Sequence, residues 1–160
     1  MQSSTITPDN RESITESLMP VFPSTQWLEA VASVATEDTG YRKFGRVDVL
    51  AGLKVGDRAF CLTFDVFDIR DVKEVPAAEL SDVDFYLDMT PEQWRAMIES
   101  IRSEGHAGLE YTLNTLDLKL PDGLHHNAAD DGYRADKFFR FNESLQRFFD
   151  LSAGVETTFA

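Results

Sequence analysis

The sequence predicts an α+β domain, in which a mostly antiparallel sheet of about five strands carries helices on one face. Apolar and polar residues alternate along consecutive segments between residues 47 and 88, a pattern typical of strands with one buried face. Apolar residues recur with a period of about 3.6 in segments before and after this region, which indicates amphipathic helices. Because helices and strands do not alternate regularly along the chain, a doubly wound parallel sheet is disfavoured.

The first helix is predicted to begin after Ser24, a residue type that is favoured at helix N-caps. The apolar residues that follow at helical spacing are Trp27, Leu28, Val31, Val34 and Ala35. This stripe predicts that one side of the helix is buried. Gly40 is expected to end the helix.

Two strands joined by a tight turn are predicted next. Residues 47–55 alternate between apolar and mostly polar or small side chains, and residues 60–66 do so on the return. Gly56-Asp57 between them predicts a type II′ turn, because glycine stands first. The alternation continues over residues 67–72, so the return strand is either long or bends into another strand before Pro76 stops it.

The alternation over residues 83–88 predicts a further strand with one solvent-exposed face. A helix follows directly, and its start is clearly indicated by the sequence. Thr90, Pro91 and Gln93 supply the N-cap, the first helical residue and the third residue of a capping box. The side chains that this helix is expected to bury are Trp94, Met97, Ile98 and Ile101. Gly105 is expected to end it.

The segment from residue 107 to residue 120 is ambiguous, because its leucines fit helical spacing and, towards its end, also alternation. We expect a short helix from about residue 107, then a strand at Leu116–Leu120 and a polar loop at Leu124–Gly132. The last predicted helix covers Ala135–Leu151. It holds five of the twelve phenylalanines, so we expect it to be deeply covered.

These patterns predict a flexible leader at residues 1–21, a single domain at residues 22–151 and a loose tail at residues 152–160. Lysine and arginine total 15 and aspartate and glutamate total 28, which gives a net charge of −13. Such a surface repels phosphate backbones and anionic headgroups. We therefore expect no nucleic acid partner and no strong binding to anionic membranes.

A cytoplasmic location is predicted from the N-terminal segment and from cysteine usage. Met1–Phe22 lacks the basic segment followed by an apolar segment that secretory signals have. Cys61 is the only cysteine, so no intrachain disulfide can form, which fits a reducing compartment. We expect the protein to be a monomer or a homodimer.

Sequence motifs for phosphate binding, metal binding or a hydrolase nucleophile are not found, so we expect no cofactor, no metal and no catalytic residue. Cys61, in a predicted strand, is more typical of a small buried side chain than of a nucleophile. One alternative is a small enzyme of the ketosteroid isomerase or polyketide cyclase type. In that case His125, His126 and Asp130 would supply a base beside an apolar pocket.

The main functional hypothesis is based on the large apolar side chains. They either fill an ordinary core or line a cavity between the sheet and the helices that accepts a hydrophobic ligand. The residues predicted to line such a cavity are Trp27, Phe60, Leu62, Phe64, Phe85, Trp94, Met97, Ile101, Phe138, Phe141, Leu145 and Phe148.

Three segments of the sequence resemble the sterol carrier protein type 2-like domain family. They are the helix start Ser24–Trp27, the connector Tyr41-Arg42, and the stretch Ser81–Trp94, in which a strand with aspartates feeds a capped helix. The phenylalanine-rich C-terminal helix also looks like the closing element of that family. The resemblance therefore spans most of the chain, from Phe22 to Leu151.

The resemblance implies a five-stranded sheet covered by helices around an apolar tunnel for lipids, sterols or acyl chains, with no shared catalytic residues to carry over. Leu118–Gly123 and the insertion His125–Asp131 depart from the family's pattern, which leaves the identity of the ligand open. The predicted function is binding or carrying of a hydrophobic small molecule, as an accessory to lipid or aromatic metabolism. A further alternative is an interaction subunit that docks through the phenylalanine-rich face of residues 138–149.

Overall fold

The computed structural model describes residues 19–160, so most of the predicted leader lies outside the described residues. The strands of its main sheet are β2 (Val47–Val55), β3 (Arg58–Val66), β4 (Asp68–Val75), β5 (Phe85–Met89) and β6 (His125–His126). A second, two-stranded sheet consists of β1 (Val21–Phe22) and β7 (Thr158–Phe159). The main sheet has the order β4-β3-β2-β5-β6, and its neighbours are antiparallel except for the parallel pair β2 and β5.

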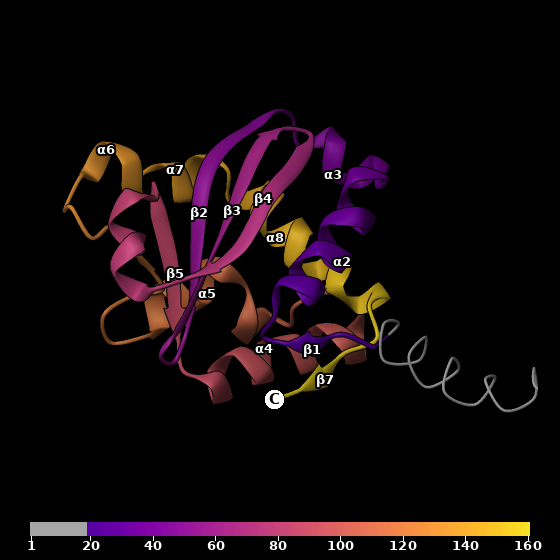
Figure 1. Ribbon diagram of the computed structural model, residues 1–160. Coiled ribbons are helices and arrows are strands. Elements are labelled where there is room, and N and C mark those ends of the chain that lie inside the picture. The colour runs from indigo at the N-terminus through magenta and orange to yellow at the C-terminus, as the bar shows by residue number, and fades with distance from the viewer. Residues whose placement is uncertain (1–18) are drawn as a thin grey trace, which may run out of the picture.

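Helices cover one face of the main sheet, as Figure 1 shows. The α-helices are α2 (Thr25–Thr36), α3 (Thr39–Lys43), α4 (Pro91–Glu104), α5 (Leu113–Lys119), α6 (Gly132–Ala135), α7 (Lys137–Arg140) and α8 (Asn142–Asp150). The short 3-10 helices are η1 (Ala77–Asp82), η2 (Leu109–Tyr111) and η3 (Leu151–Gly154). The predicted fold class is therefore confirmed. Within residues 19–160, no helix combines the length and apolar character needed to cross a membrane.

Local sequence signals explain where the two longest helices begin. At α2, the hydroxyl of Ser24 accepts a hydrogen bond from the backbone N–H of Trp27 at 3.0 Å. At α4, the N–H of Gln93 donates to the hydroxyl of Thr90, and the Gln93 side chain accepts from the N–H of Thr90. Caps of this kind stabilise a helix by about 1 kcal/mol each. Both predicted helix starts are confirmed.

The core between the main sheet and the helices is one continuous cluster of buried apolar residues. Leu53 and Phe60 point into this cluster, whereas Cys61 points to a smaller cluster beneath η1. Trp94 fixes α4 to the sheet, because it is fully buried and donates its indole N–H to the backbone oxygen of Lys54 at 2.8 Å. The alternation read from the sequence thus separates the helix-covered face of the sheet from the face under η1.

The strand predicted at Leu116–Leu120 is wrong, because Leu116–Lys119 belongs to helix α5 and Leu120 is its C-cap. Thr112 caps α5 by accepting a hydrogen bond from the N–H of Thr115 at 3.2 Å. The helical spacing of the leucines therefore prevails over their alternation, and Leu116 is buried. The fifth strand is instead β6, inside the segment Leu124–Gly132 that was predicted to be a polar loop, where His125 pairs with Leu87 of β5.

The single helix predicted over Ala135–Leu151 is wrong as well, because the chain breaks into α6, α7 and α8. The backbone departs from helical geometry at Phe141, with φ −110° and ψ 19°. The break redirects the chain, so that Phe138 packs on Phe85 of β5 while Phe148 packs on Phe64 of β3. Beyond this segment, η3 and β7 occupy part of residues 152–160, which were predicted to be a loose tail.

Two tight turns connect β2, β3 and β4. Gly56 has a φ of 62° at the first position of its turn, as the predicted type II′ turn requires. Val66 has the same φ of 62° in the turn between Asp65 and Asp68, which pair with each other across β3 and β4. A β-branched residue is strained in this left-handed region.

Replacing Val66 with glycine is expected to stabilise the protein. The substitution removes a strain of about 1–2 kcal/mol, and the greater freedom of glycine in the unfolded chain offsets about 0.5–1 kcal/mol of this gain. A rise of about 3 °C in the melting temperature is expected by calorimetry. Phe67→Gly is the matched control, because Phe67 follows in the same turn without a positive φ. Destabilisation by Val66→Gly would contradict the strain argument.

Candidate functional site

The twelve residues predicted to line an apolar cavity all lie in or against the main core. Eleven of them are buried, and Phe141 is partly exposed. They pack against other core residues; for example, the ring centroids of Phe64 and Phe148 are 5.5 Å apart. Four surface pockets in the described region are lined by other residues. The fold therefore brings the predicted residues together, and the surface pockets lie outside them.

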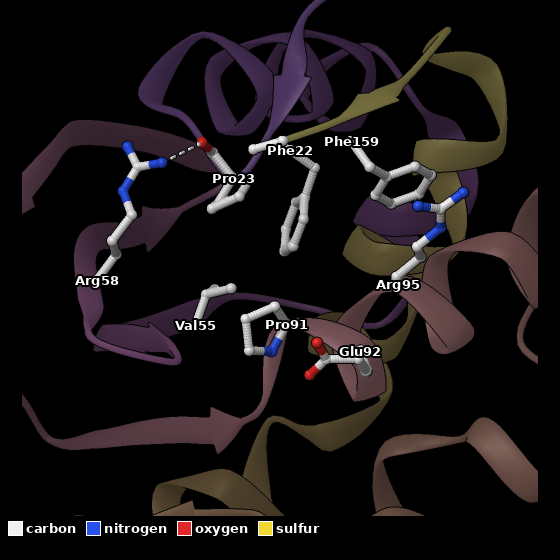
Figure 2. A pocket seen from close by; sticks show the side chains of 9 residues that line it. Phe22, Pro23, Val55, Arg58, Pro91, Glu92, Arg95 and Phe159 are labelled. Carbon is white, nitrogen blue, oxygen red and sulfur yellow. Dashed lines mark hydrogen bonds between the residues drawn. The ribbon is translucent and has the colours of Figure 1, made fainter.

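One of these pockets has mostly apolar walls and opens beside the aromatic part of the core. Its volume is about 280 Å³, and its lining residues are Phe22, Pro23, Val55, Arg58, Pro91, Glu92, Arg95, Phe159 and Ala160. We call it the Phe22 pocket. In Figure 2, Phe22 and Phe159 face Val55 and Pro91 across the hollow, and the guanidinium groups of Arg58 and Arg95 lie at its two ends.

Segments far apart in the sequence build the Phe22 pocket. Phe22 belongs to β1, which pairs in parallel with β7 and so places Phe159 on the same wall. The N–H of Thr158 donates to the backbone oxygen of Pro20 at 3.2 Å, and the N–H of Ala160 donates to that of Phe22 at 3.1 Å. The end of β2, the start of β3 and the first turns of α4 complete the walls.

The ring of Phe22 joins the pocket to the core. It packs edge-on against Trp27 with ring centroids 4.8 Å apart, and it lies 5.8 Å from Trp94. Trp94 in turn packs on Phe149, with ring centroids that are also 5.8 Å apart. Trp27 and Trp94, two of the residues predicted to line a cavity, thus lie directly behind the pocket wall. Phe22 itself is 3% exposed, so it separates the pocket from these two indoles.

The two arginines that line the Phe22 pocket are each paired with a carboxylate. Arg58 donates to both carboxylate oxygens of Glu74, at 2.8 and 2.9 Å, and to the backbone oxygen of Pro23 at 3.3 Å. The hydrogen bond from Arg58 lowers the pKa of Glu74 below its usual value. Arg95 lies 3.3 Å from the carboxylate of Glu99, and its guanidinium stacks on Phe159 at 4.6 Å from the ring centroid.

His125, from the alternative enzyme hypothesis, forms its hydrogen bond with Asp117 rather than with Asp130. The Nδ1–H of His125 donates to Oδ1 of Asp117 at 2.8 Å, and its ring stacks on Phe138 with centroids 4.5 Å apart. Burial raises the pKa of Asp117, but hydrogen bonds from His125 and from the N–H of Leu124 outweigh this and lower it overall. The interaction fixes β6 to the end of α5.

His126 and Asp130 do not join this pair. His126 stacks on Tyr86 with ring centroids 5.6 Å apart, and its Nε2 lies 3.3 Å from the backbone oxygen of Gly123. Asp130 is exposed, with a φ of 56°. The structure therefore does not assemble His125, His126 and Asp130 into one site. In residues 19–160, no group of three histidine, cysteine, aspartate or glutamate side chains is arranged to hold a metal ion.

The phenylalanines of residues 138–149 point mostly into the core. Phe138, Phe148 and Phe149 are buried, whereas Phe139 is 54% exposed. The interaction subunit hypothesis needs these rings at the surface. That hypothesis therefore does not fit the structure, because the face it relies on is already covered by the sheet and by α4.

Comparisons with known proteins identify the fold. No family model matches the sequence, and no curated protein matches it. The crystal structure of sterol carrier protein 2 is similar to this chain, with a TM-score of 0.54 and 16% sequence identity. The similarity covers 81% of this chain and 95% of that chain. The fold is therefore like that of sterol carrier protein 2, as the sequence resemblance implied.

Proposed function

We propose that this chain, which has the fold of sterol carrier protein 2, binds a hydrophobic small molecule in the Phe22 pocket. The observation that carries the proposal is the pocket itself. It is open to solvent, its walls are mostly apolar, and the aromatic core lies directly behind Phe22. The name of the similar structure describes a carrier of sterols, and an apolar ligand for this chain is consistent with it.

The volume of the pocket limits the size of the ligand that it can enclose. Ligand pockets commonly enclose about 300–1,000 Å³, and the Phe22 pocket, at about 280 Å³, lies just below that range. Each Å² of apolar surface that the ligand buries contributes about 25 cal/mol, offset by the cost of ordering it. A small apolar molecule or one end of a longer chain fits the pocket. A longer ligand reaches Trp27 and Trp94 only when Phe22 moves aside.

A substitution that fills the pocket tests the proposal. Val55→Phe extends a wall residue into the hollow, so we expect its affinity for the uncharged dye Nile red to fall by about tenfold or more. Val55→Ala leaves the hollow open and should retain binding. Leu118→Phe is the matched control, because Leu118 is 88% exposed and lies outside the pocket. Binding is measured by the rise in dye fluorescence, and folding by circular dichroism.

The outcome that contradicts the proposal is equally specific. Folded Val55→Phe protein that binds Nile red as tightly as Leu118→Phe would place the dye elsewhere. Failure of the unmodified protein to bind the dye would also contradict it.

We also propose that the protein works in the cytoplasm, where thiols stay reduced. Cys61, the only cysteine of the chain, is buried in β3 beneath η1. Burial raises the pKa of its thiol, so it is a poor nucleophile. The fold therefore neither contains a disulfide nor depends on one.

A further inference from the structure

The charges around the Phe22 pocket favour one class of apolar ligand. Arg58 and Arg95 are the two cationic residues that line the pocket, and each already faces a carboxylate, from Glu74 and Glu99 respectively. A third carboxylate, that of Glu92, lines the pocket directly, and no ion pair within residues 19–160 engages it. Neither guanidinium is therefore left without a carboxylate partner at this site.

The first turn of α4, which also lines the pocket, does not provide an anion site either. A helix N-terminus attracts anions through its free N–H groups and its dipole. Here Pro91 has no N–H, and the N–H of Gln93 is bonded to the hydroxyl of Thr90. Glu92 adds a negative charge within this turn, so the position that an anionic ligand would use already carries a carboxylate.

We propose that the Phe22 pocket selects uncharged apolar molecules over carboxylates of the same chain length, and that Glu92 is a specificity-determining residue. The proposal rests on the function proposed above and defines its ligand class. A carboxylate entering the pocket would lose part of its hydration and find no cation without a partner. It would also approach a molecule whose net charge is −13. An alcohol loses less hydration on entry and brings no negative charge next to the carboxylate of Glu92.

Decanol and decanoate provide the test, because they differ only at the polar end. Binding is followed by the fluorescence of Trp27 and Trp94, the only two tryptophans of the chain, whose rings lie against Phe22. At a pH where decanoate is ionised, we expect decanol to bind at least about tenfold more tightly. Two variants should each reduce the ratio of the decanoate to the decanol dissociation constant. Glu92→Gln does so by removing a carboxylate from the pocket, and Glu74→Gln does so by leaving Arg58 without its carboxylate partner.

The matched control is Glu143→Gln, which removes an exposed carboxylate that lines a different pocket and should leave the preference unchanged. Decanoate binding as tightly as decanol to the unmodified protein would overturn the inference and leave the proposed function standing. Failure of Glu92→Gln to narrow the preference would overturn the role of that residue. Binding of neither compound would overturn the proposed function itself.

Discussion

Replacing Trp94 with alanine is expected to lower the free energy of unfolding by about 4 kcal/mol, within the range for large aromatic residues in cores. Trp94 is fully buried between Phe22 and Phe149. Its removal leaves a cavity and deprives the backbone oxygen of Lys54 of its indole donor. Because a domain of this size has a stability of about 5–15 kcal/mol, the variant should remain folded at low denaturant. Urea unfolding followed by circular dichroism measures the change.

Two controls separate the contributions to this effect. Trp94→Phe keeps a ring in the cavity but cannot donate to Lys54, so we expect a smaller loss of about 1–3 kcal/mol. Arg95→Ala alters the next residue, whose side chain is 56% exposed, and should change stability by less than about 1 kcal/mol. If Trp94→Ala lowered the free energy of unfolding no more than Arg95→Ala does, Trp94 would not anchor α4 to the sheet.

Replacing Asp84 with alanine is expected to give the next largest effect, a loss of about 2–3 kcal/mol, because it leaves charged and polar groups without their partner. The carboxylate of Asp84 is 13% exposed and accepts from the N–H of Leu50 at 2.9 Å. It also pairs with Arg134 at 3.2 Å and Lys137 at 3.3 Å. In the variant, the Arg134 and Lys137 side chains can be partly rehydrated, which limits the loss of stability.

The same substitution should loosen the chain between β6 and α7. Arg134 and Lys137 lie at the end of that segment, so we expect faster cleavage there by a protease at low concentration. Asp82→Ala is the matched control, since Asp82 is exposed and meets Arg134 only through its backbone oxygen. Equal cleavage rates in the two variants would show that Asp84 does not hold this segment.

Features that depend on neighbouring residues could be predicted from the sequence. The caps at Ser24 and Thr90 and the turn at Gly56 involve groups no more than three residues apart, so their side-chain types suffice. The alternation in β2 and β3 likewise follows from which face of each strand is buried. These signals were enough to predict the fold class.

Features that depend on distant contacts could not be predicted in this way. Strand β6 is two residues long, and it forms because His125 pairs with Leu87, thirty-eight positions earlier. Asp117 was missed as the partner of His125, because a strand was expected where α5 lies. The Phe22 pocket was missed because Phe22 and Phe159 stand outside any periodic pattern and meet only through the pairing of β1 with β7.

The pairing of β1 with β7 has a consequence for synthesis on the ribosome. Phe22 is synthesised more than a hundred residues before its partner Phe159. Contacts of such long sequence separation form slowly. In a nascent chain, Phe22 therefore lacks the neighbouring pocket wall that Phe159 provides until residue 159 has been synthesised. If the pocket binds an apolar ligand as proposed, that ligand can bind only after Phe159 has been synthesised and has paired.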